Sequence, residues 1–137
     1  MKIDIHAFQV FGGLMLSFTA KLAAATECSN LMFTEIADPD DSYQARFVEL
    51  YNDDAGCNKI GKHNGKDIYL ATVFNSNTDY SSKVLLTGQT IPSDGFFLVC
   101  YNEADFLAAY PTSSCDLASG SVVASNGDDS YLVSSNF

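Results

Sequence analysis

The chain has 137 residues, of which 47% are hydrophobic, and 17 acidic side chains outweigh 7 basic ones, giving a formal net charge of -10. The length suits a single domain. The shortage of Lys and Arg argues against direct binding of nucleic acid or of an anionic membrane surface, because both need clustered positive charge. Ten Phe and seven Tyr supply enough apolar surface for a packed core, which argues against disorder.

The first 25 residues have the pattern of a secretory signal peptide. An apolar run from Ala7 to Ala20 is followed by Lys21 and then by the small residues 23–25, which are typical of a signal peptidase site. We therefore expect cleavage after Ala25 and a mature domain of residues 26–137 that is secreted and extracellular.

Two other interpretations of this segment remain open. An uncleaved membrane anchor is one, although the uncharged stretch of residues 5–20 is shorter than the ~20 residues that span a bilayer. A buried core helix is the other, and it is disfavoured by Gly12 and Gly13. We expect no membrane span after cleavage.

Short alternating runs bounded by turn residues predict strands from residue 31 onward. The runs 31–37 and 46–51 flank a turn cluster and predict a hairpin, with Ile36 out of step with the alternation. Residues 53–67 are predicted to form a long irregular connection. Further strands are expected at residues 68–74, 83–87, 95–101, 122–123 and 131–133.

One helix is predicted over residues 102–110. Glu103 and Asp105 lie in its first turn, and Pro111 stops it. Many short strands with regularly spaced turn signals and a single helix are typical of an all-β antiparallel sandwich or barrel.

All four cysteines lie in the predicted mature domain, and an even number in an exported chain predicts two disulfide bonds. If the first hairpin turns near residue 41, residue 28 lies close to Cys57, so a Cys28–Cys57 bond would close the open end of the hairpin. Cys100 ends a predicted strand and Cys115 follows the predicted helix, so their bond would close a local loop. The layout favours this connectivity among the three that are possible.

Three motifs resemble the lamin tail domain family. Residues 33–37 and 46–52 are similar to the family's opening strands, with "EI" followed by "FVEL-x-N". Residues 90–99 are similar to its "I-P-x-G-G" segment, and residues 126–133 to its "N-G-D-D" segment. The resemblance implies an immunoglobulin-like β-sandwich. Together with the predicted helix, we expect an all-β, immunoglobulin-like antiparallel β-sandwich with one short helix.

The sequence departs from the family pattern at two places. Lys62 and His63 replace the aromatic residue that the family has after the glycine found here at Gly61. The family also adds a strand after the third motif, whereas this sequence ends at Phe137. We therefore expect the last strand to be missing or poorly formed, which would expose a sheet edge and favour self-association.

The resemblance implies a non-catalytic binding or scaffolding module with a protein or cell-surface partner, and not an enzyme. One alternative is an accessory domain of an exported hydrolase, of nuclease or phosphatase type, whose catalytic part is not in this chain. Another is a structural surface protein that assembles through an exposed sheet edge.

Aspartates gather in the predicted turns, and the densest group is Asp38, Asp40 and Asp41. Carboxylate oxygens are the ligands that Ca²⁺ takes from flexible loops, so calcium is a candidate ligand there, and we expect no other cofactor. The alternative is that these residues form the turn and keep an exported domain soluble.

Other polar and aromatic residues suggest chemistry less directly. Glu35 and Glu49 lie on adjacent predicted strands, where we favour a structural or recognition role over a catalytic carboxylate pair. His63 lies in the basic segment that contains Lys59, Lys62 and Lys66, and we expect an exposed loop histidine, in a loop that could contact an acidic partner. Among the tyrosines, those in loops that could stack on a ligand are Tyr43 and Tyr80.

Overall fold

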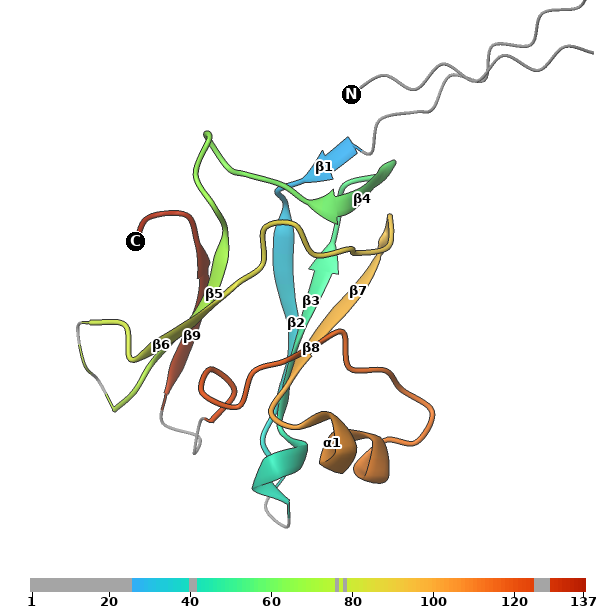
Figure 1. Ribbon diagram of the computed structural model, residues 1–137, viewed down its shortest axis with the longest axis vertical. Helices are drawn as coiled ribbons and strands as arrows, with labels where there is room; N and C mark the ends of the chain where they lie inside the picture. Colours follow the sequence, from blue (N-terminus) through green and yellow to red (C-terminus); the bar gives the residue numbers. More distant parts are fainter. Residues whose placement is uncertain (1–25, 40–41, 76, 78, 125–128) are drawn as a thin grey trace, which may run out of the picture.

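The computed structural model describes residues 26–39, 42–75, 77, 79–124 and 129–137, and this part of the chain is built mainly from short strands (Figure 1). The strands are β1 (Thr26–Cys28), β2 (Leu31–Ala37), β3 (Phe47–Asn52), β4 (Cys57–Ile60), β5 (Tyr69–Val73), β6 (Ser82–Leu85), β7 (Gly95–Cys100), β8 (Leu117–Ala118) and β9 (Ser130–Ser134). The helical elements are the 3-10 turn η1 (Tyr43–Ala45) and the helix α1 (Glu103–Ala109).

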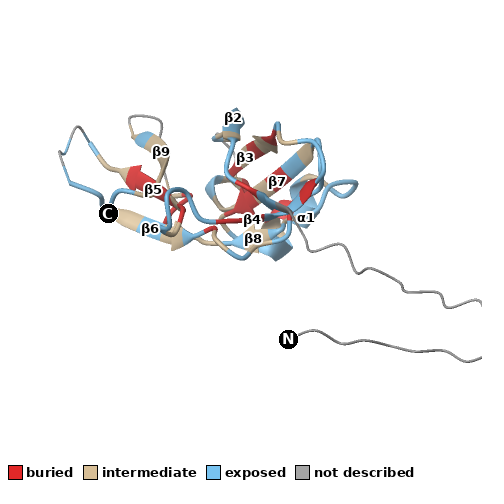
Figure 2. Ribbon diagram, turned by 90° about the horizontal axis from the view of Figure 1, so that it is seen from above, coloured by how far each residue is buried: buried red, intermediate tan, exposed pale blue. Residues whose placement is uncertain are grey.

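The strands form two main sheets that face each other as layers (Figure 2). The larger sheet has the order β2–β3–β7–β8 and the smaller sheet the order β6–β5–β9, while β1 and β4 form a separate parallel pair. Neighbours in the two main sheets are antiparallel except for β7 and β8. The predicted all-β, sandwich-like class with a short helix is confirmed.

The main core lies between the two layers. Because side chains alternate across a strand, every second residue of β3 and β7 points inward, and Val48, Leu50, Phe97 and Val99 are fully buried there. The smaller sheet contributes Leu70 from its central strand. We call the surface of the larger sheet that faces this core its inner face, and the opposite surface its outer face.

Helix α1 covers one part of the outer face. Asn102 caps the helix by accepting a hydrogen bond from the amide of Asp105 at 3.2 Å. The buried Phe106 packs edge-on against Phe47, with ring centroids 5.5 Å apart, beside the buried Cys100. The helix predicted over residues 102–110 is therefore confirmed, and it leaves the rest of the outer face uncovered.

The predicted first hairpin and the predicted disulfide connectivity are both confirmed. The predicted first hairpin is the antiparallel pair β2–β3, in which Leu31 lies opposite Asn52. The favoured disulfides are both formed, Cys28–Cys57 with Cα atoms 5.4 Å apart and Cys100–Cys115 with Cα atoms 5.8 Å apart. Two intrachain disulfides indicate an oxidising environment.

Two predictions are wrong. The strand expected at residues 122–123 is a turn, because the amides of Val122 and Val123 both donate to the carbonyl of Ser119, at 3.1 and 3.0 Å, which turns both side chains into the core. The connection expected to be irregular contains β4. This strand forms because Cys57 and Ile60 are buried and because it pairs with β1 instead of a sequence neighbour.

The predicted signal segment, residues 1–25, lies outside the described residues. Within the described part of the chain, no helix has both the length and the apolar character needed to cross a membrane.

Candidate functional site

The pairing of β2 with β3 sets which side chains of β2 point toward the core. Phe33 lies opposite Leu50, and Ile36 lies opposite Val48. Residues directly opposite each other in an antiparallel pair share a face, so Phe33 and Ile36 both belong to the inner face. A register shift after Phe33, where the strand has a β-bulge, explains why Ile36 falls out of step with the alternation in the sequence.

The inner face of β2 is exposed although that of β3 is not. Phe33 is 38% exposed and Ile36 is 52% exposed, whereas Val48 and Leu50 are both 0% exposed. Figure 2 shows the same change from buried β3 to exposed β2 at the margin of the sheet. The smaller sheet therefore leaves β2 uncovered, and the sandwich is open along this side.

The other margin of this open side is β9. It is the edge strand of the smaller sheet and lies on the same side of the sandwich as β2 (Figure 2). A pocket of about 270 Å³ joins the two strands, since both contribute to its lining. The lining residues are Ser29, Leu31, His63, Ile68, Val133, Ser134, Ser135 and Asn136. We use the name open side for β2, β9 and the pocket between them.

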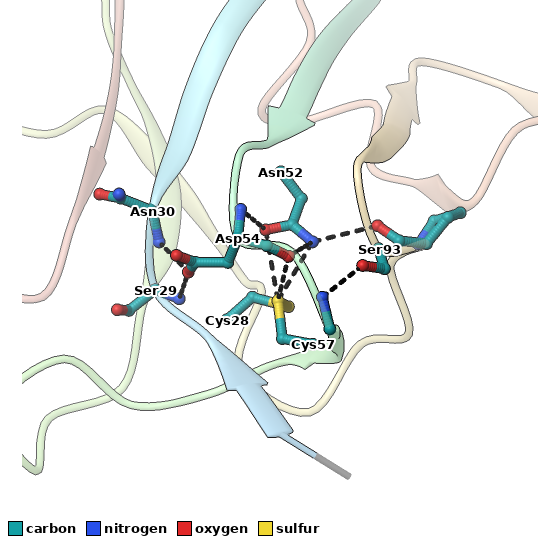
Figure 3. The surroundings of a disulfide bond; sticks show 9 residues. Cys28, Ser29, Asn30, Asn52, Asp54, Cys57 and Ser93 are labelled. Atoms are coloured by element: carbon teal, nitrogen blue, oxygen red, sulfur yellow. Dashed lines mark hydrogen bonds between the residues drawn. A yellow bond between two sulfur atoms is a disulfide. The ribbon is translucent and has the colours of Figure 1, made fainter.

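The start of β2 is fixed next to the first disulfide (Figure 3). The carboxylate of Asp54 accepts hydrogen bonds from the backbone amides of Ser29 and Asn30, at 3.2 and 3.3 Å. These two residues directly follow Cys28, which the disulfide ties to Cys57. The N-terminal end of β2 is therefore held in place by the disulfide and by the hydrogen bonds to Asp54.

Asn52, at the end of β3, completes this anchor and is fully buried. Its side-chain nitrogen donates to the carbonyl of Pro92 at 3.0 Å, and its side-chain oxygen accepts from the amide of Asp54 at 3.1 Å (Figure 3). In the sequence, Asn52 is noticed only as the last residue of the segment 46–52 that resembles the "FVEL-x-N" strand. The sequence gives no direct sign that this asparagine bridges three segments.

The outer face beside β2 is acidic. Glu35 lies directly opposite Glu49, and the hydroxyl of Thr34 donates to the carboxylate of Glu49 at 2.7 Å. Like charges placed opposite each other are unfavourable. The ion pairs found among the described residues lie elsewhere, so neither carboxylate has a described cationic partner. The structure thus brings these two residues together, on an open sheet surface.

Aromatic and apolar side chains lie on the same outer face. Met32 is opposite Tyr51, which is opposite Phe96, and the two rings have centroids 5.1 Å apart. Met32 and Phe96 are both about half exposed. The hydroxyl of Tyr51 donates to the carboxylate of Asp94, and this bond raises the pKa of the phenol above its ordinary value.

The aspartates proposed for calcium are only partly described. Asp38 forms an ion pair with Arg46, whereas Asp40 and Asp41 lie outside the described residues. In the described ranges, no group of three or more His, Cys, Asp or Glu side chains is placed to hold a metal ion. The calcium site stays a prediction.

His63 is exposed, as expected for a loop histidine. Its backbone forms two reciprocal 3.0 Å hydrogen bonds with that of Lys66, which close the turn. The side chain lines the pocket of the open side together with Ser29 and Ser134. No hydrogen bond joins the imidazole to a described serine, although nucleophilic catalysis by a serine needs such a pair.

The two loop tyrosines lie in different parts of the fold. Tyr43 packs on Tyr101, with centroids 5.5 Å apart, and on the guanidinium of Arg46. Tyr80 packs on Phe137, with centroids 4.4 Å apart. They do not form a common stacking platform.

Comparison with known proteins identifies no relative of this chain. No family model, no curated protein and no solved structure matches the chain. The resemblance to the lamin tail domain therefore stays a prediction that depends on the three motifs.

Proposed function

We propose that this protein is an exported, non-catalytic binding module of lamin-tail type, which takes a segment of a partner protein along its open side. The observation that carries the proposal is the exposure of Phe33 and Ile36 on the same face as Leu50 and Val48, the fully buried residues opposite them. Apolar side chains exposed together at a sheet margin are typical of interaction sites.

The geometry favours a partner segment that extends the sheet as an additional strand beside β2 over a partner that only covers the exposed side chains. Covering the exposed halves of Phe33 and Ile36 would contribute only about 1 kcal/mol each, which is too little for stable binding by itself. An extended segment would also pair with the free backbone edge of β2, and backbone hydrogen bonds supply most of the affinity in strand addition.

Export is supported by two independent features. Residues 1–25 have the signal pattern, and the two disulfides fit an oxidising compartment. An acidic, disulfide-bonded module of this kind would meet its partner outside the cell.

The test is a selection of random peptides on the immobilised, oxidised protein. Peptides with alternating apolar residues should be enriched, and they should lose binding to the Phe33→Ser/Ile36→Ser variant. The matched control, Leu85→Ser/Leu107→Ser, removes two similarly exposed apolar side chains away from the open side and should bind like the unmodified protein. Enriched peptides that bind the first variant as well as the control would contradict the proposal.

A further inference from the structure

The open side has a chemical asymmetry that bears on what it binds. The neighbours of an added strand would differ on its two faces, because side chains alternate across a strand. Side chains of the added strand that point to the inner face would lie beside Phe33 and Ile36. Those that point to the outer face would lie beside Glu35, which is itself opposite Glu49.

The edge of β2 is well suited to accept a strand. Within the described residues it pairs with β3 alone, and its sequence contains neither proline nor lysine. Native edges are commonly protected by those residues. The strand does carry two features that commonly protect an edge, the bulge after Phe33 and the charge of Glu35.

The charge on the outer face selects among occupants. The basic residues of the described chain are Arg46, Lys59, Lys62, Lys66 and Lys83, and none of them pairs with Glu35 or Glu49. The carboxylate of Asp94, held by Tyr51, adds negative charge to the same face. A positive side chain on an added strand would therefore relieve an existing repulsion.

A second copy of this chain is a poorer occupant. Pairing two β2 edges would bring Glu35 and Glu49 of both copies onto one continuous sheet, and each copy has a formal net charge of -10. Repulsion of this kind disfavours close association.

We propose that the open side binds an extended segment of a basic protein, in which apolar residues facing the core alternate with Lys or Arg residues facing Glu35 and Glu49. This inference depends on the proposed function, because it names the chemistry of the segment that the binding module takes.

The experiment uses two synthetic peptides as long as β2, seven residues, with capped ends. Both have valine at every second position, and the positions between are all lysine in one peptide and all glutamate in the other. Isothermal titration of the oxidised protein measures their affinities. We expect the lysine peptide to bind at least about tenfold more tightly, because each exposed charge pair contributes a modest amount and several add up.

A charge-matched pair of variants separates local pairing from general attraction to an acidic protein. Glu35→Gln/Glu49→Gln should reduce the preference for lysine to less than about threefold. Asp79→Asn/Glu103→Gln removes the same charge outside the larger sheet and should keep the preference. Equal losses in both variants would overturn the inference.

The remaining outcomes distinguish the two proposals. Equal binding of the lysine and glutamate peptides, both lost in Phe33→Ser/Ile36→Ser, would overturn the basic partner and leave the binding module standing. Failure of both peptides to bind would contradict both proposals. A concentration-dependent dimer in sedimentation, lost on the same serine substitutions, would make a second copy the occupant and overturn the basic segment.

Discussion

Asn52 is a buried polar residue whose side chain holds three segments of the molecule together. It contacts the Pro92 carbonyl and the Asp54 amide, and it lies beside the sulfur of Cys57 at 3.2 Å. Asn52→Ala would leave buried groups without partners, which costs about 1 to 3 kcal/mol. We expect a fall of that size in the free energy of unfolding, measured by urea denaturation under oxidising conditions.

The control for this substitution is Asn58→Ala, in β4. Asn58 is exposed, so its replacement should change stability by less than about 0.5 kcal/mol. Equal effects of the two substitutions would show that the buried hydrogen bonds of Asn52 do not stabilise the fold.

Tyr51 gives a prediction at alkaline pH. Its folded-state pKa is raised above the ordinary value of 10.0, first by the hydrogen bond to Asp94 and then by desolvation and nearby negative charge. The stabilisation is therefore fully present below pH 10 and is lost as the pH rises through the higher folded-state pKa. Tyr51→Phe should lose less stability than the unmodified protein above that pH, as measured by thermal unfolding.

An absorbance titration of tyrosinate provides the second measurement. The unmodified protein should show one late-titrating phenol that is absent from Tyr51→Phe and still present in Tyr80→Phe. A curve that is the same in all three proteins would contradict the proposed bond between Tyr51 and Asp94.

At the scale of elements, the two disulfides should stabilise different parts of the fold. The Cys28–Cys57 bond closes a separation of 29 residues and the Cys100–Cys115 bond one of 15, so chain entropy predicts about 3.5 and about 3 kcal/mol. We expect the double serine variants to lose about those amounts in urea unfolding.

The location of the damage is the sharper test. Without Cys28–Cys57, limited proteolysis should cut near the start of β2, where Asp54 binds the chain. Without Cys100–Cys115, it should cut near α1, which packs on Phe47. The same cutting pattern in both variants would contradict this division.

Local patterns predicted most strands, the helix and the disulfides, because each depends on neighbouring residues or on hairpin geometry. They could not predict β4, because it pairs with β1, a strand far from it in the sequence, so that Cys28 lies opposite Ile60. They also could not predict the turn at Val122, which forms through hydrogen bonds from the amides of Val122 and Val123 to the carbonyl of Ser119. The order of strands in a sheet depends on contacts between residues far apart in the sequence. The position of β2 at the edge of its sheet could therefore not be predicted from local patterns either. The one local indication is that Ile36 falls out of step with the alternation of β2. The bulge explains this, because it places Ile36 on the same face as Phe33.

At the scale of the whole molecule, export gives a direct prediction. Expression of the full chain in a secretory host should release a protein that has lost residues 1–25 and has no free thiols, because the segment fits a cleaved signal and the described cysteines are all paired. Mass spectrometry of the released protein measures both. Retention of the segment in a membrane fraction would favour the anchor interpretation.

The central claim is that β2 is an accessible edge that accepts a strand. Residue-resolved hydrogen exchange tests it most directly, on the oxidised protein with and without the lysine peptide at saturation. We predict that β2 amides pointing away from β3 exchange rapidly in the free protein and become protected on binding, while those of β8 at the other edge of the sheet stay unchanged. Unchanged exchange at β2, or protection at β8 instead, would contradict the claim.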